Sequence, residues 1–248
     1  MLKSSNPSIL PSVQLSDQLA ATGERLFRGR SYLPLLLLPF FALTFLIDPP
    51  ARVAPAGWRA ICLAVALAGL AVRVWVTGSA PEGTSERSTT SIRAASLNTH
   101  GAYSLVRHPL YVANTLIALG LTLRSPSWAF PMIVVLLHVI YFERIAMAEE
   151  RFLRRKFGAA FEAWAAEVPA IVPKSRAAFK RAPFSWRRAA GELHAWMVIA
   201  AGFFVADVLE ASLVRHRVAV EARAWTMLAA GAVPFGLYAL QKRWSRRK

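Results

Sequence analysis

Two pairs of ionisable residues stand at the edges of apolar segments of this chain. Arg107 and His108 directly precede Pro109, where an apolar stretch begins, and Glu149 and Glu150 follow the next stretch. A cation and a titratable ring can hold an anion or move a proton, and carboxylates can accept hydrogen bonds from hydroxyl or ammonium groups. Because charges near lipid are costly and often functional, the two pairs indicate a site for a charged small molecule.

Each pair also has a purely structural interpretation. An arginine at the end of a membrane span can extend its head group toward lipid phosphates, and Pro109 suits the first turn of a helix. Glu149 and Glu150 can form weak ion pairs with arginines at helical spacing. When these residues are considered alone, a functional and a structural role are therefore both open.

The composition of the chain indicates a membrane protein. Hydrophobic residues make up 55% of the 248 residues, charged residues only 18%, and the mean hydropathy is +0.38, which excludes an ordinary soluble domain. The 30 Lys and Arg exceed the 14 Asp and Glu and give a formal charge of +16. In so apolar a chain, this excess favours anionic lipid and membrane topology over nucleic acid. The single cysteine, Cys62, excludes an intramolecular disulfide.

Six apolar stretches predict the fold class. A span needs about 20 apolar residues, with about 17 as the lower limit, so the shorter stretches qualify once flanking residues are counted. We therefore expect an all-α, polytopic integral membrane helical bundle with about six transmembrane helices. The first stretch is expected to be a retained span rather than a cleaved signal, because 30 residues precede it. The stretches cover residues 31–47, 58–77, 109–123, 127–142, 195–214 and 224–241.

The basic residues are divided unequally between the two sides of such a bundle. If both termini lie on one side, most of the 30 Lys and Arg lie there too, and the positive-inside rule predicts that this side is cytoplasmic. It also holds the 78–108 loop and the 143–190 segment. The abundance of Ala and Arg indicates a bacterial chain, and hence an inner-membrane protein. The basic residues on the other side are Arg52, Arg59, Arg124, Arg215, Arg217 and Arg223.

Two of the cytoplasmic segments have room for chemistry. Residues 78–99 are polar and rich in Ser and Thr, which predicts a flexible loop or lid. Residues 143–173 continue the preceding span with apolar residues at helical spacing and arginines between them, which predicts a cytoplasmic, basic amphipathic helix along the membrane surface. The apolar positions of this helix are Ile145, Ala148, Phe152, Phe157, Phe161 and Trp164.

The connection between two spans brings the ionisable pairs together. Only a short turn around residues 124–126 separates the stretch that starts at Pro109 from the next one, so the two spans are expected to be antiparallel neighbours. Residues before the first span and residues after the second then share one membrane face. We therefore expect Arg107 and His108 to lie close to Glu149 and Glu150, in one polar pocket.

The two pairs belong to a longer pattern, which over about residues 60–175 closely resembles the isoprenylcysteine carboxyl methyltransferase family. That family, with the related phospholipid N-methyltransferases, consists of integral membrane enzymes that use S-adenosylmethionine. The resemblance implies that Arg107 and His108 are catalytic and that Gly101 and Tyr103 shape the approach to the pocket. It implies cofactor-binding roles for Tyr103, Arg107, His108, Pro109, Tyr111, Glu149 and Glu150. The pattern comprises Gly101, Tyr103, Val106, Arg107, His108, Pro109, Tyr111, Glu149, Glu150, Leu153, Phe157, Gly158, Val168, Pro169 and Pro173.

The extent of the resemblance divides the chain into three segments. Residues 1–57 hold the first span, residues 58–175 form the methyltransferase core with the cofactor pocket, and residues 176–248 hold the last two spans and a basic tail. Relatives often carry two tyrosines where this chain has Phe161 and Trp164, so any hydrogen bond of those hydroxyls is lost here. The substrate does not follow from the fold, because the outer segments lie beyond the resemblance.

The chemistry of the cofactor agrees with these residue types. Arg107 can pair with its carboxylate, Glu149 or Glu150 can accept from its ribose hydroxyls or ammonium, and a tyrosine ring can face its sulfonium for about 0.5–2 kcal/mol. The candidate rings are Tyr103, Tyr111 and Tyr141. Methyl transfer to an anionic oxygen needs alignment but no base, whereas an amine acceptor needs His108 or a glutamate to take its proton. Arg107 can alternatively hold an anionic acceptor.

The sequence therefore predicts an S-adenosylmethionine-dependent methyltransferase with a lipidic acceptor inside the bilayer, most simply through O-methylation of a carboxylate or phosphate head group. The alternatives are a phospholipid amine N-methyltransferase, an NADPH-dependent membrane reductase of related fold, and a non-enzymatic lipid-binding membrane protein. The five histidines show no metal-ligand spacing, so no metal is expected.

Overall fold

The computed structural model describes residues 15–29, 33–81, 94–174 and 178–245. Within these ranges every regular element is helical, which confirms the predicted all-α class. The loop predicted between residues 78 and 99 lies mostly outside the described residues, so its interpretation as a lid stays a prediction. The division of the chain into three segments also stays a prediction.

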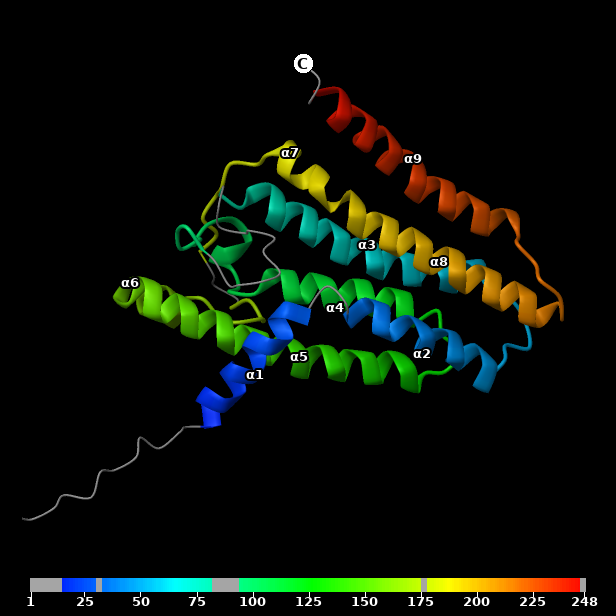
Figure 1. Ribbon diagram of the computed structural model, residues 1–248, viewed down its shortest axis with the longest axis horizontal. Coiled ribbons are helices and arrows are strands. Elements are labelled where there is room, and N and C mark those ends of the chain that lie inside the picture. Colours follow the sequence, from blue (N-terminus) through cyan, green and yellow to red (C-terminus); the bar gives the residue numbers. More distant parts are fainter. Residues whose placement is uncertain (1–14, 30–32, 82–93, 175–177, 246–248) are drawn as a thin grey trace, which may run out of the picture.

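Six helices coincide with the six apolar stretches of the sequence and lie side by side along the molecule (Figure 1). Three helical segments are long and apolar enough to cross a membrane: α3, α5, and α8 together with the short helices that precede it. These three, among the residues that the structure describes, confirm a membrane protein at this level, whereas six spans remain a prediction because α2 and α4 are shorter and α9 is not among the three. The six helices are α2 (Leu33–Ile47), α3 (Ala56–Ser79), α4 (Pro109–Thr122), α5 (Ala129–Phe157), α8 (Leu193–Val214) and α9 (Ala222–Ser245).

Helices α3 and α4 pack with their backbones in close approach. A Cβ atom on Gly120 would lie 2.5 Å from the backbone nitrogen of Ala66, and one on Gly69 would lie 2.6 Å from the carbonyl oxygen of Ala113. Glycine is needed at both positions because even a methyl group would collide with backbone atoms. Helix α8 covers this pair through Ile199, which is fully buried against α3.

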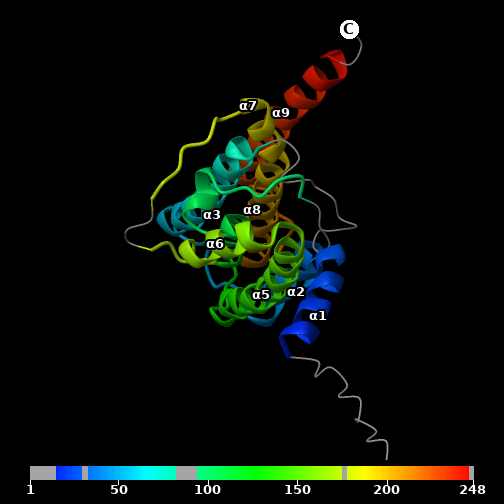
Figure 2. The same ribbon diagram turned by 90° about the vertical axis from the view of Figure 1, so that its left-hand side faces the viewer.

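Helix α1 (Leu15–Gly29) was not expected from the sequence. It lies beside α5 (Figures 1 and 2), and its buried residues Ala20, Gly23 and Phe27 recur at helical spacing along one face. Gly23 marks the contact, because a Cβ atom there would lie 1.9 Å from the carbonyl oxygen of Arg144. The segment before the first apolar stretch is therefore a packed amphipathic helix, which the periodicity of its small and apolar residues could have indicated.

The predicted amphipathic helix after residue 143 is divided between the end of α5 and helix α6 (Ala159–Glu167). Gly158 separates them with φ of 52° and ψ of −125°, a conformation that essentially only glycine adopts. The apolar side chains Phe161 and Trp164 are buried against Tyr103 and other residues of the chain itself. This apolar face therefore builds protein core, and the expected position of the helix along the membrane surface stays a prediction.

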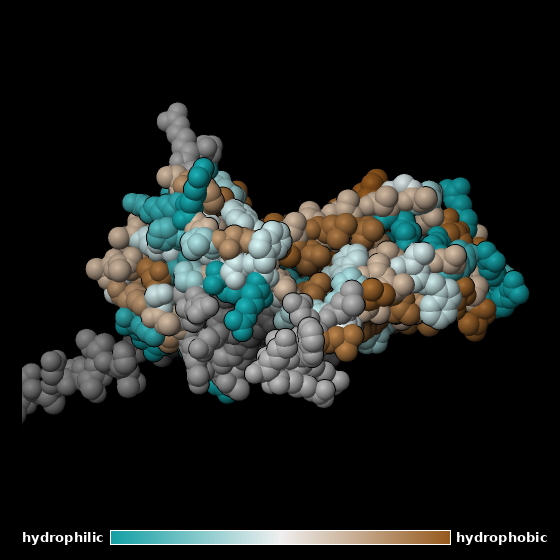
Figure 3. All heavy atoms as spheres, turned by 90° about the horizontal axis from the view of Figure 1, so that it is seen from above, coloured by the Kyte–Doolittle hydropathy of each residue, from teal (hydrophilic) through white to brown (hydrophobic). Residues whose placement is uncertain are grey.

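Figure 3 shows that apolar residues gather along the middle of the visible face, with hydrophilic residues toward both ends. This distribution is typical of a bundle whose middle is surrounded by lipid. Exposed leucines and isoleucines also lie on α2 and α5, among them Leu36, Ile47, Leu136 and Ile140.

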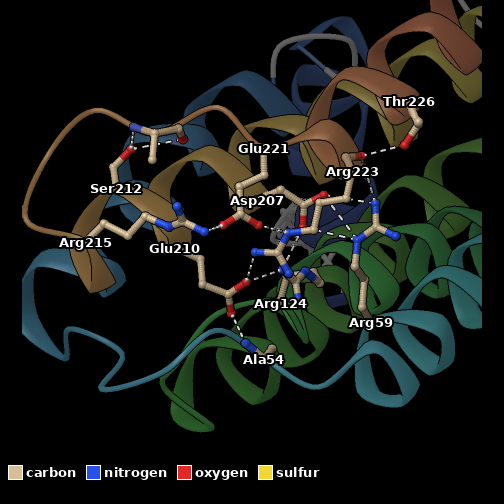
Figure 4. A network of polar contacts seen from close by, with 11 residues as sticks. Ala54, Arg59, Arg124, Asp207, Glu210, Ser212, Arg215, Glu221, Arg223 and Thr226 are labelled. Atoms are coloured by element: carbon tan, nitrogen blue, oxygen red, sulfur yellow. Dashed lines mark hydrogen bonds and ion pairs between the residues drawn. The ribbon is translucent and has the colours of Figure 1, made fainter.

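At one end of the bundle, three arginines converge on two acidic residues of α8 (Figure 4). Asp207 accepts hydrogen bonds from Arg59 at the start of α3 and from Arg124 after α4, and Glu210 accepts from Arg124 and Arg223. Asp207 and Arg124 are almost completely buried. The network ties α3, α4, α8 and α9 together at this end, opposite to the end that holds Arg107.

Candidate functional site

A cavity of about 880 Å³ opens between α1, α2, α4, α5 and α8, within the roughly 300–1,000 Å³ usual for ligand sites. One part of its wall carries charged and polar side chains, and the other part is apolar. All seven residues for which the sequence analysis proposed a cofactor-binding role line this cavity. They are Tyr103, Arg107, His108, Pro109, Tyr111, Glu149 and Glu150.

Arg107 connects three parts of the chain around the polar part of the wall. Its Nε donates to Oε1 of Glu150 over 2.8 Å, and its Nη1 donates to the carbonyl oxygens of Ala165 at 3.0 Å and Val168 at 2.6 Å. A planar guanidinium donates such bonds from separate nitrogens in a fixed geometry, whereas an ammonium group donates from a single nitrogen. Arg107 therefore fixes α5 and the end of α6 relative to the start of α4.

His108 faces both glutamates and is 6% exposed. Its Nε2 lies 2.9 Å from Oε1 of Glu150, and its Nδ1 lies 3.6 Å from Oε2 of Glu149. Burial alone would lower the pKa of His108, but the hydrogen bonds and negative charges of the two carboxylates outweigh it and raise the pKa. The imidazole is thereby held toward its protonated form, in which both ring nitrogens donate.

A stack of rings supports His108 from the first turn of α4. The rings of His108 and Tyr111 stack with centroids 5.2 Å apart, and Tyr111 stacks on Phe142 of α5 at 4.5 Å. Pro109 occupies the first position of α4, where its missing N–H costs no hydrogen bond. Helix α4 therefore starts directly after His108, whose side chain lines the cavity.

The segment after α6 pairs with the Arg107 region through its backbone. The N–H groups of Arg107 and His108 donate to the carbonyl oxygens of Pro169 and Ala170 over 2.8 and 3.0 Å. Trp164, which also lines the cavity, donates from its Nε1 to the carbonyl oxygen of Tyr103. These bonds give the tail of the sequence pattern a physical role, because it holds the Arg107 segment in place.

Tyr103 lies beside this tail on the short helix η1 (Gly101–Ser104). Burial raises the pKa of Tyr103, and the charge of Glu149 adds to this shift, so the phenol stays protonated. Gly101 opens the same element with φ of +60°, and a Cβ atom there would lie 2.8 Å from Oγ of Ser79. Glycine therefore allows the short helix to approach the end of α3.

A second polar cluster in the same cavity was missed by the sequence analysis. Arg73 on α3 donates from Nε to Oε2 of Glu192 over 2.6 Å and from Nη1 to Oδ1 of Asn114 on α4. All three residues line the cavity, and Glu192 is 2% exposed. Their signal in the sequence is that each is a polar residue inside or beside an otherwise apolar stretch, which is costly unless it is paired or functional.

The polar part of the cavity fits S-adenosylmethionine by the chemistry of its residues. The glutamates supply acceptors for hydroxyl and ammonium groups, Arg107 and His108 supply cationic donors, and Tyr103 and Tyr111 supply rings for a sulfonium. Among the described residues, no group of three or more His, Cys, Asp or Glu side chains could hold a metal ion. The polar side chains can therefore pair with both the cationic and the anionic groups of such a molecule.

Part of the chain matches a known protein family. Residues 59–160, which include all seven residues named above, match the family model described as phospholipid methyltransferase. No solved structure matches the chain.

Two named proteins resemble part of the chain. It is 38% identical over 78 residues to the cobalt-zinc-cadmium resistance protein CzcN of Cupriavidus metallidurans, covering 32% of this chain and 36% of that protein. It is 32% identical over 82 residues to the nickel-cobalt-cadmium resistance protein NccN of Alcaligenes xylosoxydans xylosoxydans, covering 33% and 38%. The chain thus spans little more than a third of the length of these relatives. The resemblance predicted from the sequence is confirmed by the family match, and residues 59–160 carry the phospholipid methyltransferase family's pattern.

Proposed function

We propose that this protein is an S-adenosylmethionine-dependent methyltransferase that acts on a lipidic acceptor within the membrane. The observation that carries the proposal is that the wall of one cavity has a polar part and an apolar part. Arg107, His108, Glu149 and Glu150 converge on one part, and side chains of α2, α4 and α8 form an apolar continuation. A water-soluble charged cofactor and an apolar acceptor can therefore meet in this cavity.

Different residues of the cavity would bind different groups of the cofactor. Glu149 and Glu150 would accept hydrogen bonds from the cofactor's ammonium or hydroxyl groups, and the Nη2 edge of Arg107 would face its carboxylate. When bound, S-adenosylmethionine supplies a methyl group whose bond to sulfur breaks as a bond to the acceptor oxygen forms, leaving a neutral thioether. The stacked rings of Tyr111 and His108 keep the wall rigid, and rigid alignment is the main demand of such a transfer.

The state of His108 supports O-methylation. Both of its ring nitrogens face carboxylates, and these contacts favour the form in which both nitrogens donate, so neither nitrogen is free to take a proton from an amine. An anionic carboxylate or phosphate oxygen has no proton to lose. We therefore expect an anionic acceptor rather than a phospholipid amine.

The apolar wall supports an acceptor that comes from the bilayer. Leu38, Val198 and Val205 line the cavity, yet they are 49%, 50% and 39% exposed. The combination of cavity lining and high exposure in apolar side chains of α2 and α8 supports an opening of the cavity toward lipid between these helices. The charge asymmetry of the sequence supports a cytoplasmic location of the polar part, where the cofactor is made available.

The names of the two relatives connect those proteins with resistance to cobalt, zinc, cadmium and nickel. A contribution of this chain to metal resistance is a separate hypothesis. Methylation of an anionic lipid would remove a negative charge to which divalent cations are attracted, which offers one chemical link between the two.

The test uses the full chain purified in nanodiscs. Titration calorimetry with S-adenosylmethionine and, separately, with NADPH should show binding of the first only. Incubation with methyl-labelled cofactor and a native lipid extract should then yield a labelled lipid, which mass spectrometry identifies. Absence of S-adenosylmethionine binding would refute the proposal, and binding of NADPH would favour a reductase.

A further inference from the structure

The cluster of Arg73, Asn114 and Glu192 is separate from the pair formed by Arg107 and Glu150, although both line one cavity. Asn114 lies in the second turn of α4, about 8 Å beyond Pro109 along the helix axis. The cluster thus lies deeper than His108, between the cofactor residues and the apolar wall. Glu192 falls outside the range that matches the family.

The hydrogen bonds of this cluster fix which groups are left for a ligand. A guanidinium only donates, so the side-chain oxygen of Asn114 must face Arg73 and the NH₂ group must point away. Arg73 uses Nε for Glu192 and Nη1 for Asn114. Within the described part of the chain, no protein group accepts from Nη2 of Arg73 or from the NH₂ group of Asn114.

A purely structural role for Arg73 would require only its ion pair with Glu192, which ties α3 to the start of α8. Asn114 indicates a role beyond structure. Its amide has two unused donors and lies in an apolar helix, where packing alone does not require it to face a cavity. The remaining groups of Arg73 and Asn114 are all N–H donors, one set cationic. Such a set recognises an anionic oxygen group, as in a carboxylate or a phosphate.

We propose that Arg73 and Asn114 bind the anionic head group of the methyl acceptor, with Glu192 as the positioning residue that holds Arg73. This inference rests on the proposed function and assigns the acceptor to an oxygen anion carried by an apolar chain. The apolar chain of the acceptor would lie along Ile117, Leu121, Val198 and Val205, which continue the cavity from Asn114. Arg107 then binds the cofactor through its Nη2 edge, since its Nε and Nη1 already make three bonds to the protein.

The test measures binding to protein in neutral detergent micelles saturated with S-adenosylhomocysteine, with radiolabelled oleate, phosphatidic acid and phosphatidylethanolamine as separate probes. Oleate and phosphatidic acid distinguish a carboxylate from a phosphate as the natural anion. Arg73→Lys keeps the charge but removes the planar guanidinium with its several N–H donors. Asn114→Asp keeps the shape of the side chain but replaces its N–H donors with a negative charge. Both substitutions should weaken binding of the preferred anion by at least about tenfold, while affinity for S-adenosylhomocysteine changes by less than about twofold.

Arg155→Lys is the matched control, because Arg155 is an exposed arginine on α5 and its substitution should leave both affinities unchanged. Glu192→Gln should weaken anion binding in the same direction, and Glu192→Asp should partly restore it. If Arg73→Lys fails to fold, as judged by thermal unfolding, the isosteric Asn114→Asp decides. Unchanged anion binding, or a preference for phosphatidylethanolamine, would overturn this inference alone, whereas a wild-type protein that binds no S-adenosylhomocysteine would overturn the proposed function.

Discussion

Nε of Arg107 lies 2.8 Å from Oε1 of Glu150, across the hairpin of α4 and α5. The same oxygen is 2.9 Å from Nε2 of His108, so one carboxylate oxygen joins two cationic groups. Arg107 and Glu150 are each less than one-fifth exposed. A charge that is this shielded depends on its partner more than a surface charge does, and the loss of one carboxylate leaves two cations facing each other.

Glu150→Gln should therefore weaken binding of S-adenosylhomocysteine by at least about tenfold, which corresponds to about 1.4 kcal/mol. Glutamine keeps the size of the side chain but removes the charge that orients Arg107 and His108. Calorimetry in nanodiscs measures the affinity, and thermal unfolding shows whether the helices stay folded. Glu162→Gln serves as control, because Glu162 is an exposed glutamate on α6 that pairs with Arg154, away from Arg107 and His108. Equal affinities of the two variants would contradict the placement of the cofactor.

The raised pKa of His108 predicts a dependence of stability on pH. Since the pKa is higher in the folded than in the unfolded protein, the stabilisation is fully present below the unfolded value of about 6.5 and is lost as pH rises through the folded pKa. The free energy of unfolding should therefore fall as pH rises above 6.5.

The comparison with His108→Gln isolates the titration of His108 and its glutamate partners, because titrating groups that do not contact His108 contribute equally to both proteins. The stability difference between wild type and variant should shrink as pH increases through the folded pKa. Thermal unfolding in nanodiscs over this range provides the measurement. A pH-independent difference would mean that His108 does not titrate against Glu149 and Glu150 in the folded protein.

The proximity of Arg107 to Glu150 could be predicted from the sequence because a short turn forces two spans into an antiparallel pair. The same reasoning could not predict the pairing of Arg73 with Glu192. These residues belong to helices joined by more than a hundred residues, and helical periodicity carries no information on which distant helices become neighbours.

The network of arginines around Asp207 and Glu210 also depends on contacts between helices that are distant in the sequence. Arg59, Arg124 and Arg223 were counted in the sequence only as basic residues outside the positive-inside pattern. The structure shows that Asp207 and Glu210 neutralise them, which explains why arginines are tolerated at this end. The acidic partners lie within an apolar stretch of α8, and only the packing of α8 on α3 and α4 brings them to these arginines.

Gly158→Ala should destabilise the protein by about 1–3 kcal/mol, because alanine adopts the backbone conformation between α5 and α6 only with strain. It should also weaken binding of S-adenosylhomocysteine, since α6 carries the carbonyl of Ala165 that holds Arg107. Thermal unfolding and calorimetry measure the two effects.

Gly57→Ala is the matched control for that substitution. Gly57 lies in the first turn of α3 with open space around its Cα, so alanine should leave stability unchanged or raise it by up to about 1 kcal/mol. If Gly158→Ala behaved like Gly57→Ala, the turn between α5 and α6 would not be strained and would not position Arg107.

Asp207→Asn should separate stability from function. The carboxylate of Asp207 is fully buried and accepts from both Arg59 and Arg124, so its removal leaves two arginines without their shared anion and should cost about 3–5 kcal/mol. Because the network lies at the opposite end from Arg107, the affinity of the folded fraction for S-adenosylhomocysteine should not change. Thermal unfolding compared with Glu162→Gln, whose side chain is exposed and lies outside this network, tests the first expectation, and calorimetry below the unfolding temperature tests the second. Wild-type stability of Asp207→Asn would show that the arginines are held by other groups, and a loss of affinity would show that the two ends of the bundle are coupled.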